Sequence, residues 1–183
     1  MYDVVIIGAG PAGISAAIYA VSRGKKTLVI ERAQVGGLIG RVSAVTHYAG
    51  ITEGETGVTF SEKLKAQAER ANIELVYETV VSVKLSGEKK EIQTKQHTYE
   101  AAKVILANGT SPRKLGIVGE AELCGKGMSM NAAQHGMLYR GKNVYVVGGA
   151  DGAVKEALYL AQYAAQVTII HFEETLGCIA EFK

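Results

Sequence analysis

Short apolar runs alternate with amphipathic stretches along the first part of the chain. The runs at residues 4–7 and 27–30 are rich in valine and isoleucine, which favours buried strands. Residues 11–22 between them contain few helix breakers and predict a helix, so the three segments form a β-α-β unit. The same order returns later, where strands are predicted at 143–147 and 167–170 and a helix at 154–164.

Between these two units the pattern predicts one more helix and a small β-meander. Ser61, with a glutamate soon after it, is expected to cap an exposed amphipathic helix over residues 61–71. Strands are then predicted at 74–77, 80–85, 91–95, 98–100 and 103–107, with a polar hairpin turn at 86–90.

This order of elements predicts an α/β fold in two parts. Residues 1–113 are expected to form a Rossmann-like three-layer domain, in which a parallel sheet is combined with the β-meander. The irregular stretch 114–126 is the best candidate for a boundary. A partial second Rossmann unit is expected over residues 114–183.

The composition narrows the class of protein. Twenty basic residues against 18 acidic ones, a formal net charge of +2, argue against a nucleic-acid-binding surface. No apolar run approaches the roughly 18 residues needed to cross a bilayer, and Asp3 and Gly8 interrupt the N-terminal stretch, which argues against a signal peptide. Cys124 and Cys178 form no CxxC motif and no metal-ligand cluster. We therefore expect a cytoplasmic protein without a metal site that binds neither nucleic acid nor membrane.

The segment at residues 8–13, GAGPAG, fits the dinucleotide-binding pattern G-x-G-x-x-G between a predicted strand and a predicted helix. Gly8 permits a tight turn, Gly10 lets the backbone approach a pyrophosphate, and Gly13 lets the helix pack against the strand. Glu31 ends the next strand, where its carboxylate can accept hydrogen bonds from ribose hydroxyls. A glutamate there disfavours a 2′-phosphate, so the residues predict FAD or NAD. The expected contacts in this loop are Gly8, Gly10, Pro11, Ala12 and Gly13.

Several stretches resemble the two-domain thioredoxin reductases and their flavoprotein relatives: MYDVVIIGAGPAGISAAIYA, then ER and GG, then VILANGTSPRKLGIVGE. The similarity extends through almost the whole chain, as far as VTIIH. The resemblance implies that the first loop binds FAD, with Gly36 and Gly37 near the ribitol and flavin and residues 107–109 beneath the cofactor. The further cofactor contacts expected are Arg32, Leu38, His47, Val80, Val81, Ala107, Asn108 and Gly109.

The flavin half of this site departs from the family pattern. Leu38 stands where the family usually has a glutamine, and residues 46–50, THYAG, replace a usual Glu-Asn-Tyr-Pro-Gly. The resemblance implies that an asparagine contact to the flavin side is either lost or taken over by His47. Tyr48 and Gly50 match parts of a segment that lies against the isoalloxazine ring. We expect an intact adenosine half and an altered flavin half.

The second glycine-rich segment, GGADGA at residues 148–153, also lies between a predicted strand and a predicted helix, but it fits the dinucleotide-binding pattern less well than the first. Ala150 stands where the second required glycine belongs, and its Cβ points toward the closest approach of a pyrophosphate. Relatives that use NADPH carry a His-Arg-Arg stretch after the next strand, whereas this chain has His171, Phe172 and Glu173. A carboxylate repels a 2′-phosphate. We therefore expect weak or no binding of NADPH or NADH and a unit kept for packing.

The redox dithiol of thioredoxin reductases is missing. The positions of its two cysteines hold Asn131 and Gln134, and neither amide can form a thiolate. His135 replaces the acid that follows the dithiol. This histidine is a candidate proton donor near a flavin, although a solvent-facing or helix-capping histidine is the favoured interpretation. Reduction of thioredoxin through a dithiol is not expected.

The chain also stops soon after its second β-α-β unit begins, whereas family members return to complete the first domain. A natural truncation, one part of a split enzyme and a fragment of a longer product all remain open. An open sheet edge and an incomplete pocket would expose apolar surface. We therefore expect a homodimer, or burial of this surface by a complementing chain.

The function predicted is that of an FAD-binding, thioredoxin reductase-like flavoprotein of oxidoreductase type. Its electrons would enter from another donor, such as ferredoxin or another redox partner protein. One alternative is a ferredoxin- or flavin-linked NAD(P)H oxidoreductase of the same fold. Another is a non-catalytic nucleotide-binding or interaction module that has kept the fold and lost the chemistry.

Overall fold

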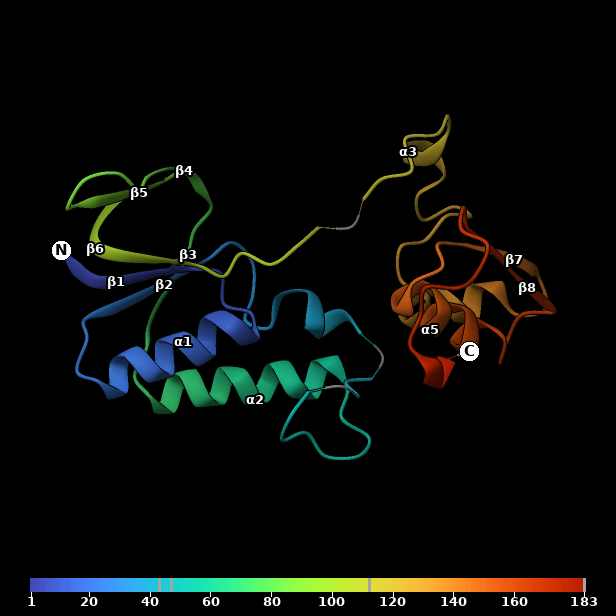
Figure 1. The fold of residues 1–183 in the computed structure, drawn as a ribbon, viewed down its shortest axis with the longest axis horizontal. Coiled ribbons are helices and arrows are strands. Elements are labelled where there is room, and N and C mark those ends of the chain that lie inside the picture. The colour runs from blue at the N-terminus through green and yellow to red at the C-terminus, as the bar shows by residue number, and fades with distance from the viewer. Residues whose placement is uncertain (43, 47, 112, 183) are drawn as a thin grey trace. The chain divides into compact units, whose positions relative to one another are not determined.

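The structure, a computed structural model, describes residues 1–42, 44–46, 48–111 and 113–182 (Figure 1). The chain divides into two compact units, Met1–Ser111 and Pro112–Lys183. Each unit has its own sheet and its own helices.

The first unit contains a single six-stranded sheet in the order β3-β2-β1-β6-β5-β4. Strand β1 pairs in parallel with β2 and β6, and β2 pairs in parallel with β3. Strands β4 and β5 are antiparallel and form the meander with the first part of β6. The elements are β1 (Tyr2–Ile7), α1 (Pro11–Ser22), β2 (Thr27–Glu31), η1 (Gly37–Arg41), α2 (Gly57–Arg70), β3 (Glu74–Tyr77), β4 (Val80–Lys84), β5 (Lys90–Thr94) and β6 (Thr98–Leu106).

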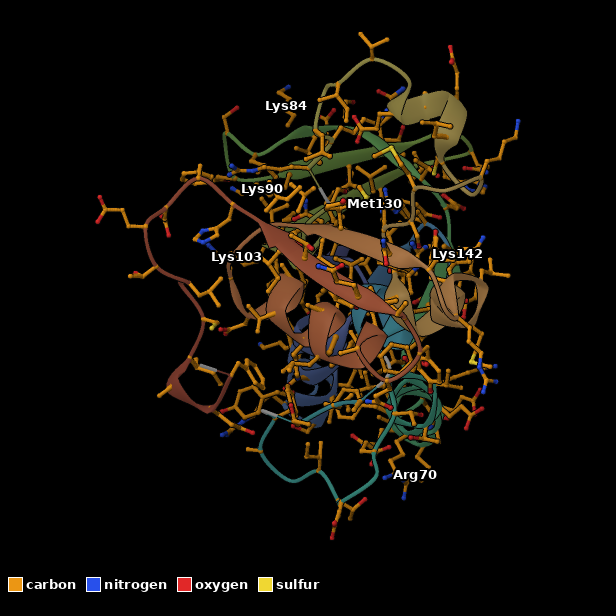
Figure 2. The ribbon with its side chains drawn as sticks, turned by 90° about the vertical axis from the view of Figure 1, so that its right-hand side faces the viewer. Arg70, Lys84, Lys90, Lys103, Met130 and Lys142 are labelled. Atoms are coloured by element: carbon orange, nitrogen blue, oxygen red, sulfur yellow. The ribbon has the colours of Figure 1, made fainter. Side chains whose placement is uncertain are left out.

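Strand β6 joins the meander to the parallel sheet. The sequence pattern predicts two separate strands at 98–100 and 103–107, and the structure corrects this to one continuous strand. Its first residues, Thr98 to Ala101, pair with β5, whereas Ala101 to Leu106 pair with β1. Two different partners therefore stabilise one strand. Figure 2 labels Lys84, the last residue of β4, and Lys90, the first residue of β5, which flank the hairpin turn.

Two hydrophobic clusters, one on each face of the sheet, make the first unit a three-layer structure. Successive residues of a strand face opposite sides, so Ile6 and Val5 of β1 belong to different clusters. Ile6 packs with Ile14 of α1 and Phe60 of α2, and Figure 1 shows these two helices side by side along one face of the strands. Val5 shares the other cluster with Ile92 of the meander. The predicted three-layer α/β fold is therefore confirmed.

Helix α2 begins earlier than the sequence pattern indicates. Its N-cap is Thr56, whose side chain accepts a hydrogen bond from the Thr59 amide while the Thr59 hydroxyl accepts one from the Thr56 amide. The prediction of Ser61 as the cap is wrong. Ser61 lies inside the helix and donates a hydrogen bond to the Gly57 carbonyl at 2.8 Å. The reciprocal capping box satisfies backbone groups that Ser61 would have left unpaired.

The second unit contains a two-stranded parallel sheet of β7 (Asn143–Val147) and β8 (Gln166–Ile170). Helix α5 (Asp151–Leu160) connects the two strands and buries Val154, Ala157 and Leu160. It starts and ends a few residues before the predicted 154–164. The shorter elements are α3 (Glu120–Leu123), α4 (Ala132–His135), η2 (Gly136–Tyr139) and η3 (Ala180–Phe182). Among the described residues, no helix has both the length and the apolar character needed to cross a membrane.

The buried carboxylate of Glu55 makes stability depend on pH. Glu55 is 4% exposed, and its pKa is held below its usual value first by a hydrogen bond from Lys63 and then by one from Thr59. Such a group stabilises the fold above its unfolded pKa of about 4.3, and this contribution is lost as the pH falls through the lower folded pKa. Between about pH 6 and about pH 3 we expect the free energy of unfolding, measured by urea titration, to fall more in the wild type than in Glu55→Gln.

The matched control for this prediction is Glu62→Gln, which removes an exposed carboxylate from α2, the helix that follows Glu55. Its pH dependence should follow that of the wild type. An identical pH dependence in the wild type and Glu55→Gln would contradict the stabilising role of Glu55.

Candidate functional site

The first glycine loop follows β1 and turns sharply at Gly8. Gly8 has a φ of +105°, which disfavours any residue with a side chain. Its amide donates a hydrogen bond to the Ile30 carbonyl at 2.8 Å. A Cβ atom placed on Gly8 would overlap with the Ala107 carbonyl and would lie 3.1 Å from the Asn108 Cα. The turn therefore depends on glycine, and it brings residues 107 and 108 against the loop.

Gly10 and Gly13 serve different purposes in the same loop. A Cβ atom on Gly13 would overlap with the carbonyl oxygen of Gly8, because α1 lies directly against the end of β1. A Cβ on Gly10 would have only the Gly36 carbonyl oxygen near it, at 3.9 Å. Gly13 is thus required by packing, whereas Gly10 borders open space that a ligand can enter.

The N-terminus of α1 has the properties of an anion site. Gly10 is its N-cap, Pro11 is its first residue, no side chain caps it and no acidic residue stands in its first turn. The amides of a first helical turn have no partners within the helix, and the helix dipole places partial positive charge there. Together with the open space at Gly10, this arrangement suits a pyrophosphate.

Glu31 is held at the end of β2 by two backbone amides. Its side chain is buried, its Oε2 accepts a hydrogen bond from the Ala9 amide at 2.8 Å, and its Oε1 accepts one from the Ala33 amide at 2.9 Å. A carboxylate oxygen can accept more than one hydrogen bond, so both oxygens keep capacity for ribose hydroxyls. The contact with Ala9 was not predicted, because a main-chain donor leaves no signal in the sequence.

A glycine pair after β2 forms another wall of the site. The Gly36 amide donates a hydrogen bond to the Ala9 carbonyl at 2.9 Å. Gly36 and Gly37 have φ values of +105° and +58°, and a Cβ on Gly37 would lie 3.8 Å from the Gly10 Cα. The backbone at Gly36 and Gly37 therefore lies beside Gly10 and borders the same open space.

The remaining predicted contacts are distributed unevenly. Asn108 and Gly109 directly follow Ala107, which packs against Gly8. Val80 packs against the hydrophobic cluster that contains Val5 and Ile92. Val81, the next residue of β4, is 53% exposed. Pro11 and Ala12 open α1, Arg32 and Leu38 are exposed, and His47 lies outside the described residues. The assignment of these residues to the cofactor site stays a prediction.

The segment predicted to lie against the flavin ring borders a hollow next to this loop. Tyr48 packs edge-on against Phe60, with ring centroids 5.0 Å apart. Tyr48 and Gly50 line a hollow of about 370 Å³ together with Pro11 and Lys63. Pro11 belongs both to this hollow and to the α1 N-terminus, so the two features adjoin.

The second glycine loop repeats the backbone turn of the first and differs at the helix N-terminus. The Gly148 amide donates to the Ile170 carbonyl at 2.8 Å, as the Gly8 amide does to Ile30. The N-cap of α5 is Ala150, and Asp151 places a carboxylate in its first turn. That carboxylate supplies negative charge where a phosphate would bind, so the second loop is less suited to an anion than the first.

The dithiol position carries no thiol chemistry. Both cysteines are free thiols, with Cys124 exposed and Cys178 buried. The Oγ of Ser129 lies 2.7 Å from Nδ1 of His135, and the same Oγ accepts a hydrogen bond from the Asn131 amide. His135 therefore has a local hydrogen-bond partner, and its role as a proton donor stays a prediction. In the part of the chain that the structure describes, no cluster of three metal-ligating side chains is present.

These features define the class of protein: a Rossmann-type α/β protein whose first glycine loop suits a dinucleotide. The family model described as pyridine nucleotide-disulphide oxidoreductase matches residues 2–182, and the chain belongs to that family. The thioredoxin reductase of Peptoclostridium acidaminophilum is 42% identical over 176 residues, which are 96% of this chain and 56% of that protein. The chain thus spans about half the length of this relative.

Solved structures confirm the resemblance to thioredoxin reductases. The crystal structure of Lactococcus lactis thioredoxin reductase matches with a TM-score of 0.92 at 36% identity, over 100% of this chain and 60% of that one. A ferredoxin-flavin thioredoxin reductase from Clostridium acetobutylicum matches with a TM-score of 0.58 at 34% identity, over 98% of this chain and 62% of that one. The chain therefore has the FAD-binding oxidoreductase fold of thioredoxin reductases.

The different surroundings of Gly13 and Gly10 predict different costs for the same substitution. Gly13→Ala forces a methyl group against a backbone carbonyl and should lower the free energy of unfolding of the apoprotein by about 1–3 kcal/mol. Gly10→Ala adds its methyl group to open space and should cost less than about 1 kcal/mol. Chemical denaturation without added nucleotide measures both. Equal losses for the two variants would show that the close contact between α1 and β1 is not the reason for Gly13.

Proposed function

We propose that this chain is an FAD-binding flavoprotein of the thioredoxin reductase type that works without a redox dithiol and without NADPH at its second loop. The observation that carries the proposal is the contrast between two loops of the same design. The first borders open space at Gly10 and an uncapped helix N-terminus, whereas the second has Ala150 and Asp151 at the corresponding places.

The residues of the first loop fit the adenosine diphosphate half of FAD. The α1 N-terminus would hold the pyrophosphate, and Glu31 would accept hydrogen bonds from the ribose hydroxyls. Gly36, Gly37 and residues 107–109 would flank the remaining part of the cofactor, with Val80 and Arg32 at its edge. When bound, FAD supplies one- and two-electron redox chemistry. We assign residues 1–113 to this FAD-binding domain and residues 114–183 to a partial NAD(P)-binding-like domain.

The missing dithiol restricts the chemistry that the chain can perform. Flavin-linked disulfide reduction needs a thiolate to attack and a second thiol to resolve the mixed disulfide. Asn131 and Gln134 cannot take either part, and Cys124 and Cys178 are unpaired. His135 is retained as a candidate proton donor only. Electrons carried by FAD would therefore leave by another route.

A protein donor is the favoured source of electrons. The similarity to a ferredoxin-flavin thioredoxin reductase supports a protein rather than a nicotinamide nucleotide in this role. The alternatives are an NAD(P)H oxidoreductase of the same fold and a module that binds nucleotide without catalysis. The open edge of β6 beyond its pairing with β5 favours burial by a second copy or a complementing chain. We propose the cytoplasm as its compartment, where two unpaired cysteines remain reduced.

A flavin spectrum tests the proposal. The purified chain, reconstituted with FAD, should be yellow and should stay oxidised when excess NADPH or NADH is added without oxygen. Reduced ferredoxin should bleach it. Bleaching by either nucleotide would favour the NAD(P)H oxidoreductase, and failure to bind FAD would overturn the proposal.

A pair of variants tests whether FAD binds at the first loop. Gly10→Val adds bulk to the open space and should reduce FAD retention at least about tenfold, the equivalent of about 1.4 kcal/mol. Gly152→Val adds the same bulk to the second loop, where a Cβ meets no atom within 4 Å. That control should retain FAD as the wild type does. Loss of FAD in both variants would argue against a site in the first loop.

A further inference from the structure

Residues 172–182 leave the end of β8 and return to the start of α5 (Figure 1). The Ile179 amide donates a hydrogen bond to Oδ1 of Asp151 at 2.8 Å, across 28 positions of sequence. Cys178, next to it, is only 6% exposed. One turn later the Phe182 ring lies 5.5 Å from the Lys155 Nζ. The hydrogen bond from Ile179 and the contact between Phe182 and Lys155 therefore hold this segment against the N-terminal half of α5.

The segment lies where a dinucleotide would approach the second loop. A Cβ on Gly177 would be 3.9 Å from the Gly149 carbonyl oxygen, and a Cβ on Gly149 would be 2.7 Å from Nδ1 of His171. His171 at the end of β8 and Gly177 of the segment therefore both lie close to Gly149 of the second loop.

Negative charge beside the second loop disfavours a phosphate there. Asp151 stands in the first turn of α5, where a carboxylate is stabilised by the helix dipole. Oε2 of Glu173 lies 3.5 Å from the Cβ position of Gly177, which adds a second carboxylate beside the loop. The Ile179 amide brings a hydrogen-bond donor and no charge. A pyrophosphate would bring negative charge to two carboxylates.

We propose that residues 172–182 form an intrinsic cover, latched by Asp151, that excludes dinucleotides from the second glycine loop. Asp151 then holds the cover in place over the second loop. Two features of the loop oppose a dinucleotide, the cover and Ala150, and they act separately. The inference concerns the second loop alone and does not require that the first loop bind FAD.

The rates at which the two cysteines react with a thiol reagent test whether the cover holds. In the full chain, iodoacetamide should modify exposed Cys124 rapidly and Cys178 at least about tenfold more slowly, as mass spectrometry of the alkylated peptides measures. Asp151→Ala removes the acceptor of the Ile179 amide, and a hydrogen bond to a charged group is worth roughly tenfold to hundredfold in an equilibrium. Cys178 should therefore react roughly tenfold faster or more in Asp151→Ala, and Cys124 should not change.

Asp151→Asn is the matched control. Its amide oxygen still accepts the hydrogen bond from Ile179, so Cys178 should stay within about twofold of the wild-type rate. Two results would overturn the latch. One is Cys178 reacting as fast as Cys124 in the wild type, and the other is Cys178 staying fully protected in Asp151→Ala.

Measurements of NADH binding distinguish the effect of the cover from the effect of Ala150. Ala150→Gly alone restores the glycine pattern and should still bind no NADH, because the cover remains. Ala150→Gly combined with Asp151→Ala should bind it, as the fluorescence of added NADH measures in protein whose first loop is blocked by Gly10→Val. Binding of NADH to the Ala150→Gly chain with Cys178 still protected would overturn the exclusion. So would failure of the double variant to bind while Cys178 is reactive.

Discussion

The close approach of α1 to β1 is the constraint on which the first unit depends. Gly13 lies directly against the Gly8 carbonyl, and Gly8 in turn lies against Ala107. These contacts leave no room for side chains, so helix, turn and sheet meet at backbone distance. The α1 N-terminus therefore faces the open space beside Gly10. Glu31 and Gly36 are tied to the same loop through the two main-chain groups of Ala9.

The two units show how one backbone design can have different capacities for a ligand. Both loops follow a parallel strand, turn at a glycine with positive φ, and lead into a helix. The first helix begins without an acidic residue, and the second begins with Asp151. At the N-terminus of α5, where the first unit could bind an anion, the Asp151 carboxylate instead accepts a hydrogen bond from the Ile179 amide. On our proposal, the second unit has kept this backbone design without binding a nucleotide.

Local signals predict the first β-α-β unit closely, and long-range contacts account for the errors. The bounds of α1 follow from Pro11 and the glycines before it, and they match the structure. The strand β6 was predicted as two pieces because pairing with β1, distant in sequence, decides its length. The start of α2 was misplaced because Ser61 and Thr56 are both good caps, and the reciprocal bond from Thr59 decides between them. The bond between Asp151 and Ile179 joins residues with no common pattern, so no sequence signal identifies it.

Two glycine loops and one nucleotide site per chain are what the proposal requires. Calorimetric titration with ADP, the part that FAD and NAD share, tests this number without assuming a reaction. We expect one molecule of ADP bound per chain, displaced by FAD and lost in a chain whose first loop is blocked. Two molecules bound per chain, or one that survives blocking of the first loop, would contradict it.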